Sequence, residues 1–182
     1  MTSQLKVDRI SPANGDTIII DGWEMPEIPE VAKNLDSAFL ETRYGGYYTA
    51  IGNNVWGKMP VGEASAVIKY DYANGFDTAN NRWVCPEGHD GTYMIGHGIQ
   101  LHSNGGTVTK TTGVLHINGV EEPRSASVCY MNESEGNQWL RGVFPLYPVD
   151  LVAGDYVEFY TQTRWANSNR INGWHKFGYR LT

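Results

Sequence analysis

The sequence predicts an all-β fold, an antiparallel sandwich of two sheets that follows a short N-terminal arm. Short apolar runs alternate with clusters of turn-forming residues along most of the chain. The 182 residues include 21 glycines and 8 prolines, which suit many turns better than long helices. Aromatic residues make up 12% of the chain, which indicates a core rich in rings and further rings at an interface.

The predicted strands follow one another at short spacings, and no internal repeat is visible. Polar and glycine-containing turns separate them at 104–106, 118–123, 132–137 and 168–173. Two antiparallel sheets are the natural packing for this number of short strands. The expected strands are 47–51, 66–72, 92–101, 108–117, 125–131, 140–146, 156–163 and 176–182.

In this interpretation residues 1–40 form an attachment arm and linker, and residues 41–182 form the head domain. Apolar residues alternate within 5–22 around a turn at 11–15, which predicts a small hairpin. A hairpin of this size cannot bury a core of its own, so it is expected to dock on other protein chains. The residues expected to make that contact are Val7, Ile10, Ile18 and Ile20.

A linker punctuated by prolines follows at 23–29, and one short helix is expected after it. The helix is predicted by apolar residues at helical spacing, namely Val31, Leu35, Ala38 and Phe39. This stripe is far shorter than three heptads, so plain packing is favoured over a coiled-coil stem.

The segment 71–94 holds a strand end, a polar loop, a short strand and the start of an aromatic strand within one hairpin. In order and spacing it resembles the signature of the globular head domain of the first complement component, a sandwich of the tumour-necrosis-factor-like jelly-roll type. The matching residues are Asn74, Phe76, Asp77, Trp83, Cys85, Pro86, Gly91 and Tyr93.

Two further segments are similar to the same family: 154–159 resembles its Gly-Asp-x-Val strand start, and 177–181 resembles its closing strand. The chain departs from the pattern where Trp83 replaces a phenylalanine nearer the cysteine, and where the final glycine is displaced by one position. The resemblance implies a jelly-roll head that assembles as a homotrimer. It also implies that four aromatic residues line the core or the three-fold seam: Tyr93, Phe159, Phe177 and Tyr179.

The arm resembles a second group of proteins. Residues 7–10 and 15–22 are similar to the Val-Asp-x-Ile…Gly-x-Thr-Ile-x-Ile-Asp-Gly arms of small structural proteins of tailed bacteriophages, many from marine hosts. This resemblance implies a virion component that is made in the host cytoplasm and that binds other virion proteins through its arm.

Composition argues against several other functions. The net charge is -6 and no basic block occurs, so a nucleic-acid surface is not expected. No apolar run reaches membrane-spanning length, and residues 1–10 lack the apolar core of a signal peptide, so neither membrane insertion nor secretion is expected. No cofactor or metal is expected, with calcium in a trimer left open. Cys85 and Cys129 are expected to be reduced, buried side chains, in preference to a redox pair or a metal site with His89.

No arrangement of residues indicates an enzyme, because the nucleophile elbow, the phosphate loop and the HExxH motif are all missing. The strongest candidate binding feature is 164–174, where two tryptophans flank a loop of asparagine, serine and arginine. Such a loop can stack on a sugar ring and form hydrogen bonds with its hydroxyls. The candidate ligand-binding residues are Trp165, Asn167, Asn169, Arg170 and Trp174. In the alternative, both tryptophans are buried in the sandwich or in the trimer seam.

Together these observations predict a non-enzymatic virion protein with a trimeric head. In one hypothesis it is a tail or head fibre appendage whose apical loops bind host-surface glycan. In the alternative it is a capsid decoration or vertex protein that binds the shell through its arm. A free bacterial lectin-like domain is a third possibility, but the sequence lacks a secretion signal for it.

Overall fold

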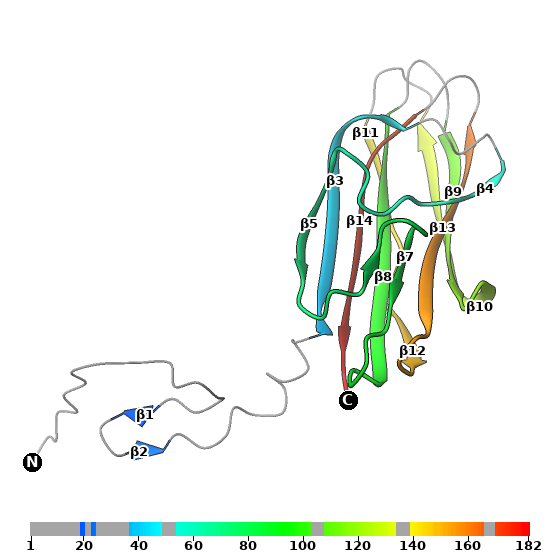
Figure 1. The fold of residues 1–182 in the computed structure, drawn as a ribbon. Helices are drawn as coiled ribbons and strands as arrows, with labels where there is room; N and C mark the ends of the chain where they lie inside the picture. Colours follow the sequence, from blue (N-terminus) through cyan, green and yellow to red (C-terminus); the bar gives the residue numbers. More distant parts are fainter. Residues whose placement is uncertain are drawn as a thin grey trace, which may run out of the picture.

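The computed structural model describes residues 19–20, 23–24, 37–48, 54–102, 108–133, 139–165 and 170–182. It confirms the predicted fold class, because two antiparallel sheets of six strands each lie face to face (Figure 1). A separate small pair is formed by β1 (Ile19–Ile20) and β2 (Trp23–Glu24).

The first large sheet, here called the β8 sheet, has the strand order β11-β8-β14-β3-β5, with β12 also paired to β8. Its strands are β3 (Phe39–Tyr48), β5 (Ala66–Asp71), β8 (Gly91–His102), β11 (Trp139–Val143), β12 (Tyr147–Leu151) and β14 (Arg170–Arg180).

The second, here called the β13 sheet, has the order β10-β9-β13-β7-β6, with β4 also paired to β13. Its strands are β4 (Trp56–Lys58), β6 (Phe76–Asp77), β7 (Arg82–Val84), β9 (Val108–Ile117), β10 (Val120–Glu133) and β13 (Tyr156–Trp165).

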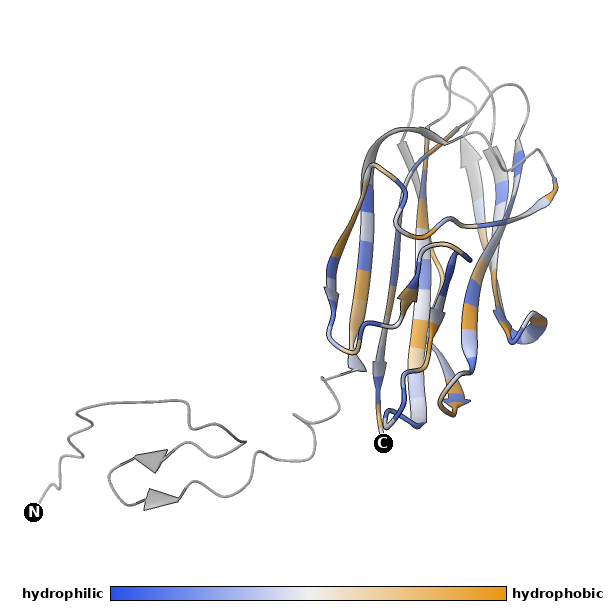
Figure 2. Cartoon of the chain, viewed as in Figure 1, coloured by the Kyte–Doolittle hydropathy of each residue, from blue (hydrophilic) through white to orange (hydrophobic). Residues whose placement is uncertain are grey.

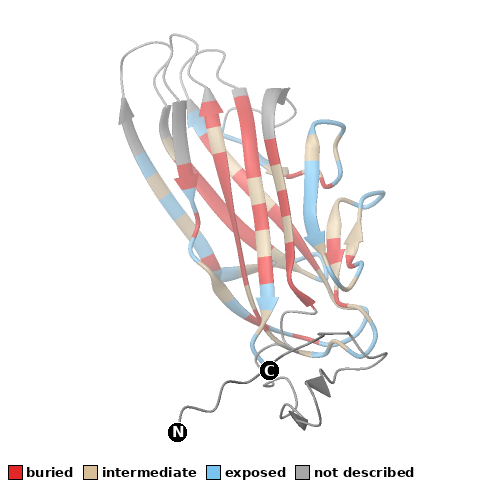
Figure 3. Ribbon diagram, turned by 90° about the vertical axis from the view of Figure 1, so that its left-hand side faces the viewer, coloured by how far each residue is buried: buried red, intermediate tan, exposed pale blue. Residues whose placement is uncertain are grey.

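Alternating side chains from the two sheets fill the space between them. Figure 3 shows this as buried residues that recur along the long strands, and Figure 2 shows the matching alternation of hydropathy. Phe39 stacks on Trp83 with 4.6 Å between ring centroids, and Phe159 meets Phe39 edge-on at 6.5 Å. These rings join the sheets, because Phe39 belongs to the β8 sheet and the other two belong to the β13 sheet.

A buried ion pair lies among these rings. Lys176 of β14 and Glu41 of β3 are register partners, both side chains are 0% exposed, and the ammonium contacts the carboxylate. The second carboxylate oxygen of Glu41 accepts a hydrogen bond from the amide of Gly62 at 2.6 Å, and the Lys176 ammonium also donates to the carbonyl of Pro60. Burial lowers the pKa of Lys176 to about 8, while the neighbouring Glu41 carboxylate opposes that shift.

The two ends of the head carry different parts of the chain. The strand ends that flank residues 49–53, 103–107, 134–138 and 166–169 lie together at one end, the upper end in Figure 1. β3 begins at the opposite end, where Phe39 pairs with Gly178 close to the C-terminus. The chain that precedes β3 therefore joins the head at the end remote from those connections.

Several strands have the bounds that the sequence predicts. The expected strands at 66–72, 92–101 and 108–117 correspond to β5, β8 and β9. The turn expected at 118–123 is found in a shorter form, since Asn118 and Gly119 have φ values of 53° and 79° and β10 begins at Val120. These are left-handed values that Asn-Gly adopts in a two-residue hairpin.

Several predictions about the strands were wrong, among them the first strand of the sandwich, which begins at Phe39 and not at 47. Phe39, expected at the end of a helix, begins β3, because alternate residues of this segment point into the core. β12 was not expected as a separate strand. β14 begins at Arg170 and not at 176, because Asn172-Gly173 forms an irregularity within the strand and not a turn.

The arm is described only at β1 and β2. Ile20 pairs with Trp23 across residues 21–22, whereas the hairpin expected around 11–15 lies outside the described residues. Val7, Ile10 and Ile18 also lie outside them. The division between arm and head at residue 40 stays a prediction.

We expect a buried histidine to make the head acid-labile. His97 on β8 is 2% exposed, packs on Phe144 and donates one hydrogen bond from Nε2 to the Tyr160 carbonyl at 3.3 Å. Burial lowers the pKa of His97 from 6.5 to about 3. The unfolded chain therefore binds this proton at higher pH than the folded chain, and stability falls as the pH drops from 6.5 towards 3, by up to about 1.4 kcal/mol per pH unit.

The measurement is urea unfolding between pH 7 and pH 4. His97→Gln should have a shallower pH dependence than the wild type, because it lacks the titrating ring. His116→Gln is the matched control, since His116 is only partly buried and stacks on Tyr160. Parallel pH profiles for wild type and His97→Gln would contradict the prediction.

Candidate interaction surfaces

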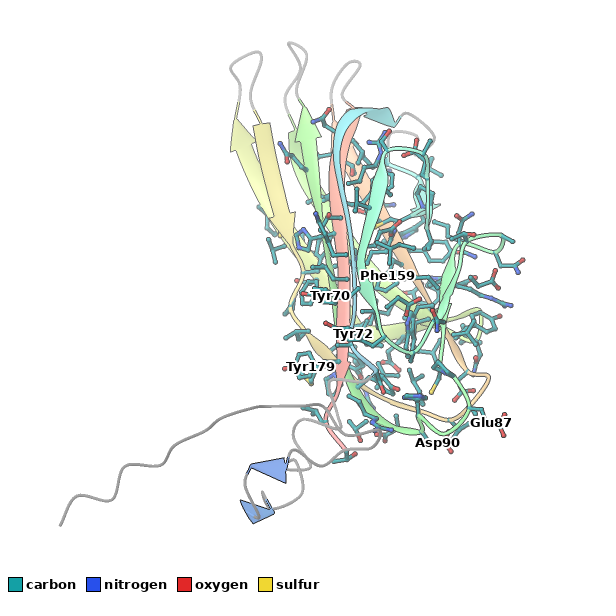
Figure 4. All side chains as sticks on the ribbon, turned by 60° about the vertical axis from the view of Figure 1, so that its left-hand side comes forward. Tyr70, Tyr72, Glu87, Asp90, Phe159 and Tyr179 are labelled. Atoms are coloured by element: carbon teal, nitrogen blue, oxygen red, sulfur yellow. The ribbon has the colours of Figure 1, made fainter. Side chains whose placement is uncertain are left out.

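The outer face of the β8 sheet is apolar. Register places its outward side chains in cross-strand rows, for example Val67, Thr42, His175 and Gly98 in one row. Several of its large side chains are exposed: Val67 51%, Tyr70 42%, Tyr72 64%, Val143 58% and Tyr179 36%. Figure 4 labels three of these rings along one side of the head, where Tyr70 stacks on Tyr72 at 5.7 Å. Contiguous apolar surface of this kind marks an interface in soluble proteins.

Glycines of β8 shape this face. A Cβ on Gly98 would overlap the His175 ring, and a Cβ on Gly96 would lie 3.0 Å from the Phe177 ring. The two rings therefore lie flat across β8, stacked on each other at 5.6 Å. Beside them is a hollow of about 350 Å³, lined by Leu40, Thr42, Arg43, Ile99, Gln100, Val143, Trp174 and His175. Burial lowers the pKa of His175, so its ring is neutral at physiological pH.

The outer face of the β13 sheet has a different chemistry. Lys58 pairs with Glu158, and the His116 ring stacks on Tyr160 at 3.9 Å. Towards the end remote from the start of β3, the same face carries Tyr130, which is 80% exposed, and Trp56, which is 39% exposed. No local pattern in the sequence indicates this surface, because its residues come from β4, β9, β10 and β13 and are brought together only by register.

The aromatic residues predicted for the core or the seam fall into two groups. Tyr93 and Phe159 are 0% exposed and belong to the core. The Tyr93 hydroxyl donates to the His89 carbonyl at 2.6 Å, and burial raises the pKa of Tyr93 well above its ordinary value. Phe177 and Tyr179 lie instead on the outer face of the β8 sheet, where a seam would be.

The candidate ligand-binding loop is shorter than the sequence suggested. Trp165 ends β13 and Arg170 begins β14, so only 166–169 lie between the two strands. Asn167 and Asn169 are outside the described residues, and of Trp165 and Arg170 only the backbone is described.

Trp174 is not a surface ring, and the expectation that it binds a ligand was wrong. It is 3% exposed in the core cluster, and the Arg43 guanidinium lies 4.6 Å from its ring centroid. It pairs with Ile99 on the inward side of β14, because the irregularity at Asn172-Gly173 shifts the alternation of that strand. The alternative, in which this tryptophan is buried in the sandwich, is correct.

Cys85 is 1% exposed, as expected for a small buried side chain, and burial raises the pKa of its thiol. Cys129 is partly buried, packs against the core and is likewise a free thiol. Among the residues that the structure describes, no three His, Cys, Asp or Glu side chains are grouped so that they could hold a metal ion. Within the same residues, no helix has the length and apolar character needed to cross a membrane.

Comparison with solved structures finds similar folds, among them the two that follow. The chain aligns with the PRD1 vertex protein P5 at a TM-score of 0.55 and 12% identity, over 80% of this chain and 73% of that chain. It aligns with the globular domain of the zebrafish complement 1qA protein at a TM-score of 0.48 and 11% identity, over 80% of this chain and 97% of that chain. No protein-family model and no curated protein sequence matches the chain. At 12% identity, the likeness to P5 concerns the fold, and it agrees with the jelly-roll class that the sequence predicts.

We expect Trp174→Ala to destabilise the head by about 3–5 kcal/mol, because it removes a buried ring and leaves a cavity. The loss should be larger than for Trp174→Phe, which keeps an aromatic ring beside Arg43 and Lys176. Urea unfolding followed by circular dichroism measures both. A loss below about 1 kcal/mol for the alanine variant would show that the ring does not belong to the core.

Proposed function

We propose that the chain is a non-enzymatic structural protein of a bacteriophage particle, in which three jelly-roll heads assemble through the outer face of the β8 sheet. The observation that carries the proposal is that apolar rows of this face follow one another along the strands from the end where β3 begins, with Tyr70, Leu40 and Phe177 in one row and Val67, Thr42, His175 and Val143 in the next. Three copies around an axis parallel to the strands would present three arms at one end and three sets of loops at the other.

The chemistry of the β8 sheet face supports a seam between copies. The rows built around Leu40, Thr42, His175, Phe177 and Tyr179 contain no charged side chain among the described residues. Depletion of charge and enrichment in aromatic side chains are the composition of an interface core. The likeness to a phage vertex protein supports a structural role in a virion and adds nothing in favour of catalysis.

Within the particle, the proposed role is attachment to the host surface as a tail or head fibre appendage. The ligand-binding residues proposed for that role are Trp165, Asn167, Asn169 and Arg170, of which Asn167 and Asn169 lie outside the described residues. The second candidate is a vertex or capsid decoration protein, and the likeness to P5 favours it. In both roles residues 1–40 bind other virion proteins, and the proposal includes no cofactor.

The homotrimer is tested in solution with the full chain. Light scattering should give three times the chain mass of 20.3 kDa at micromolar concentration. Tyr70→Glu combined with Tyr179→Glu should give a folded monomer, because an unpaired charge buried in the seam costs about 3–5 kcal/mol per site.

Tyr130→Glu is the matched control, since Tyr130 is 80% exposed on the opposite sheet and this variant should remain trimeric. A wild-type monomer would refute the trimer. A trimer that survives both seam substitutions would show that the copies meet elsewhere.

The particle role is tested with the arm. Deletion of residues 1–22 should leave the head folded and prevent its incorporation, because the removed segment contains the proposed attachment residues and none of the head strands. Co-sedimentation with purified particles measures incorporation, and full occupancy by the truncated protein would move the attachment site to the head. Adsorption then separates the two roles: particles without the protein should adsorb poorly if it binds the host, and normally if it is decoration.

A further inference from the structure

We propose that Lys176 and Glu41 condense after folding into an amide cross-link, which joins β14 to β3 inside the head. The bond forms between Nζ of Lys176 and Cδ of Glu41, with loss of one water. The two residues are register partners on neighbouring strands, and the ammonium already contacts the carboxylate. The inference concerns the folded chain alone and does not depend on the particle role or on the trimer.

The surroundings of the pair disfavour its charges. Both side chains are 0% exposed, and Nζ lies 5.1 Å from the ring centroid of Trp174 and 5.9 Å from that of Phe159. Burying two opposite charges is costly even when they attract each other. Transfer of one proton from Nζ to Oε2 of Glu41 removes both charges and leaves an amine beside a carboxylic acid. A lysine amine that has lost its proton in an apolar site is a nucleophile.

The other contacts of the pair suit an attack of this amine on Cδ. Oε1 of Glu41 accepts a hydrogen bond from the Gly62 amide at 2.6 Å. The oxygen that gains negative charge when the nitrogen adds to Cδ therefore already faces a backbone donor. Nζ also donates to the Pro60 carbonyl, which holds the nitrogen beside the carboxyl group.

The step balances without a co-reactant. After the attack, the nitrogen gives a second proton to Oε2, which leaves as water, and Oε1 becomes the amide oxygen. One ammonium and one carboxylate thus give one amide and one water, and nothing is oxidised or reduced. Hydrolysis of the amide would require water to return to a position where both side chains are fully buried, so the close packing of the core protects the product.

A second ion pair of the head shows which feature sets the first one apart. Lys58 and Glu158 are also in contact, and the Lys58 ammonium donates to the Asn80 carbonyl at 2.7 Å. Their side chains are 28% and 11% exposed, however, so water solvates the charges and keeps the lysine protonated. The Lys58–Glu158 pair is therefore expected to stay an ion pair.

The position of the cross-link gives it a mechanical consequence. β3 is the strand through which the preceding chain joins the head, and β14 is the last strand of the chain. A bond between residues 41 and 176 closes a covalent ring that contains every described strand from β4 to β13. A pull on the preceding chain would then pass from β3 to β14 through a covalent bond and not through hydrogen bonds alone.

The test is intact mass spectrometry of the full chain, stored folded at neutral pH and then denatured. We expect a mass lower than that of the sequence by one water. Trypsin should fail to cut after Lys176 and should give a branched peptide of residues 34–43 and 171–180, with the link located by fragmentation at Glu41 and Lys176. The peptides 44–58 and 142–164, which hold Lys58 and Glu158, should be recovered separately from the same digest.

Lys176→Met combined with Glu41→Leu is the matched control. It replaces the pair with apolar side chains of similar length, a change that buried ion pairs often tolerate, so the variant should fold and keep the full mass of its sequence. Three results would overturn the proposal: a wild-type chain of full mass after storage, a loss of water located at other residues, or the same loss in the control variant.

Discussion

The architecture of the head depends on one buried ion pair, Lys176 with Glu41. Its two members belong to neighbouring strands, and both are fully buried among the rings of the core. A slip of β14 by one residue would move the ammonium to the outer face and leave a buried carboxylate without its counter-ion. Because Glu41 also accepts from Gly62 and Lys176 donates to Pro60, the pair ties the segment after β4 to the β8 sheet. A charged pair thus specifies the register that apolar packing would specify less strictly.

The fixed register determines what the outer face of the β8 sheet presents. With Lys176 and Trp174 inside, His175, Phe177 and Tyr179 must point outward on the same strand. The β8 positions opposite His175 and Phe177 are Gly98 and Gly96, which lets those rings lie flat and leaves the adjacent hollow. The apolar outer face and the buried ion pair are therefore two consequences of one alignment between β14 and its neighbours.

The sequence predicted the fold class and most strands because those depend on local patterns. β5, β8 and β9 show the alternation and turn residues that mark strands, and Asn118-Gly119 has the chemistry of a tight hairpin. The start of β14 was missed because Asn172-Gly173 has the composition of a turn, and this led to the wrong assignment of Trp174. No local pattern marks Lys176 as buried, since its partner Glu41 is 135 residues away. The outer face of the β13 sheet was missed for the same reason, because its rows join four strands that are distant in sequence.

The two outer faces of the sandwich differ in polarity: one suits contact with another protein surface, and the other suits contact with water. The central rows of the β8 sheet face carry no charged side chain among the described residues and expose tyrosine and valine, so water is a poor environment for them and another copy of the same face is a good one. The outer face of the β13 sheet carries charged and polar side chains, such as Lys58 paired with Glu158, and exposes Tyr130, so water is a suitable environment for it. If copies close a trimer through the β8 sheet, the β13 sheet is left on the outside of the assembly. The same packing that removes the apolar face from water would then leave the polar and charged face of the β13 sheet exposed in all three copies.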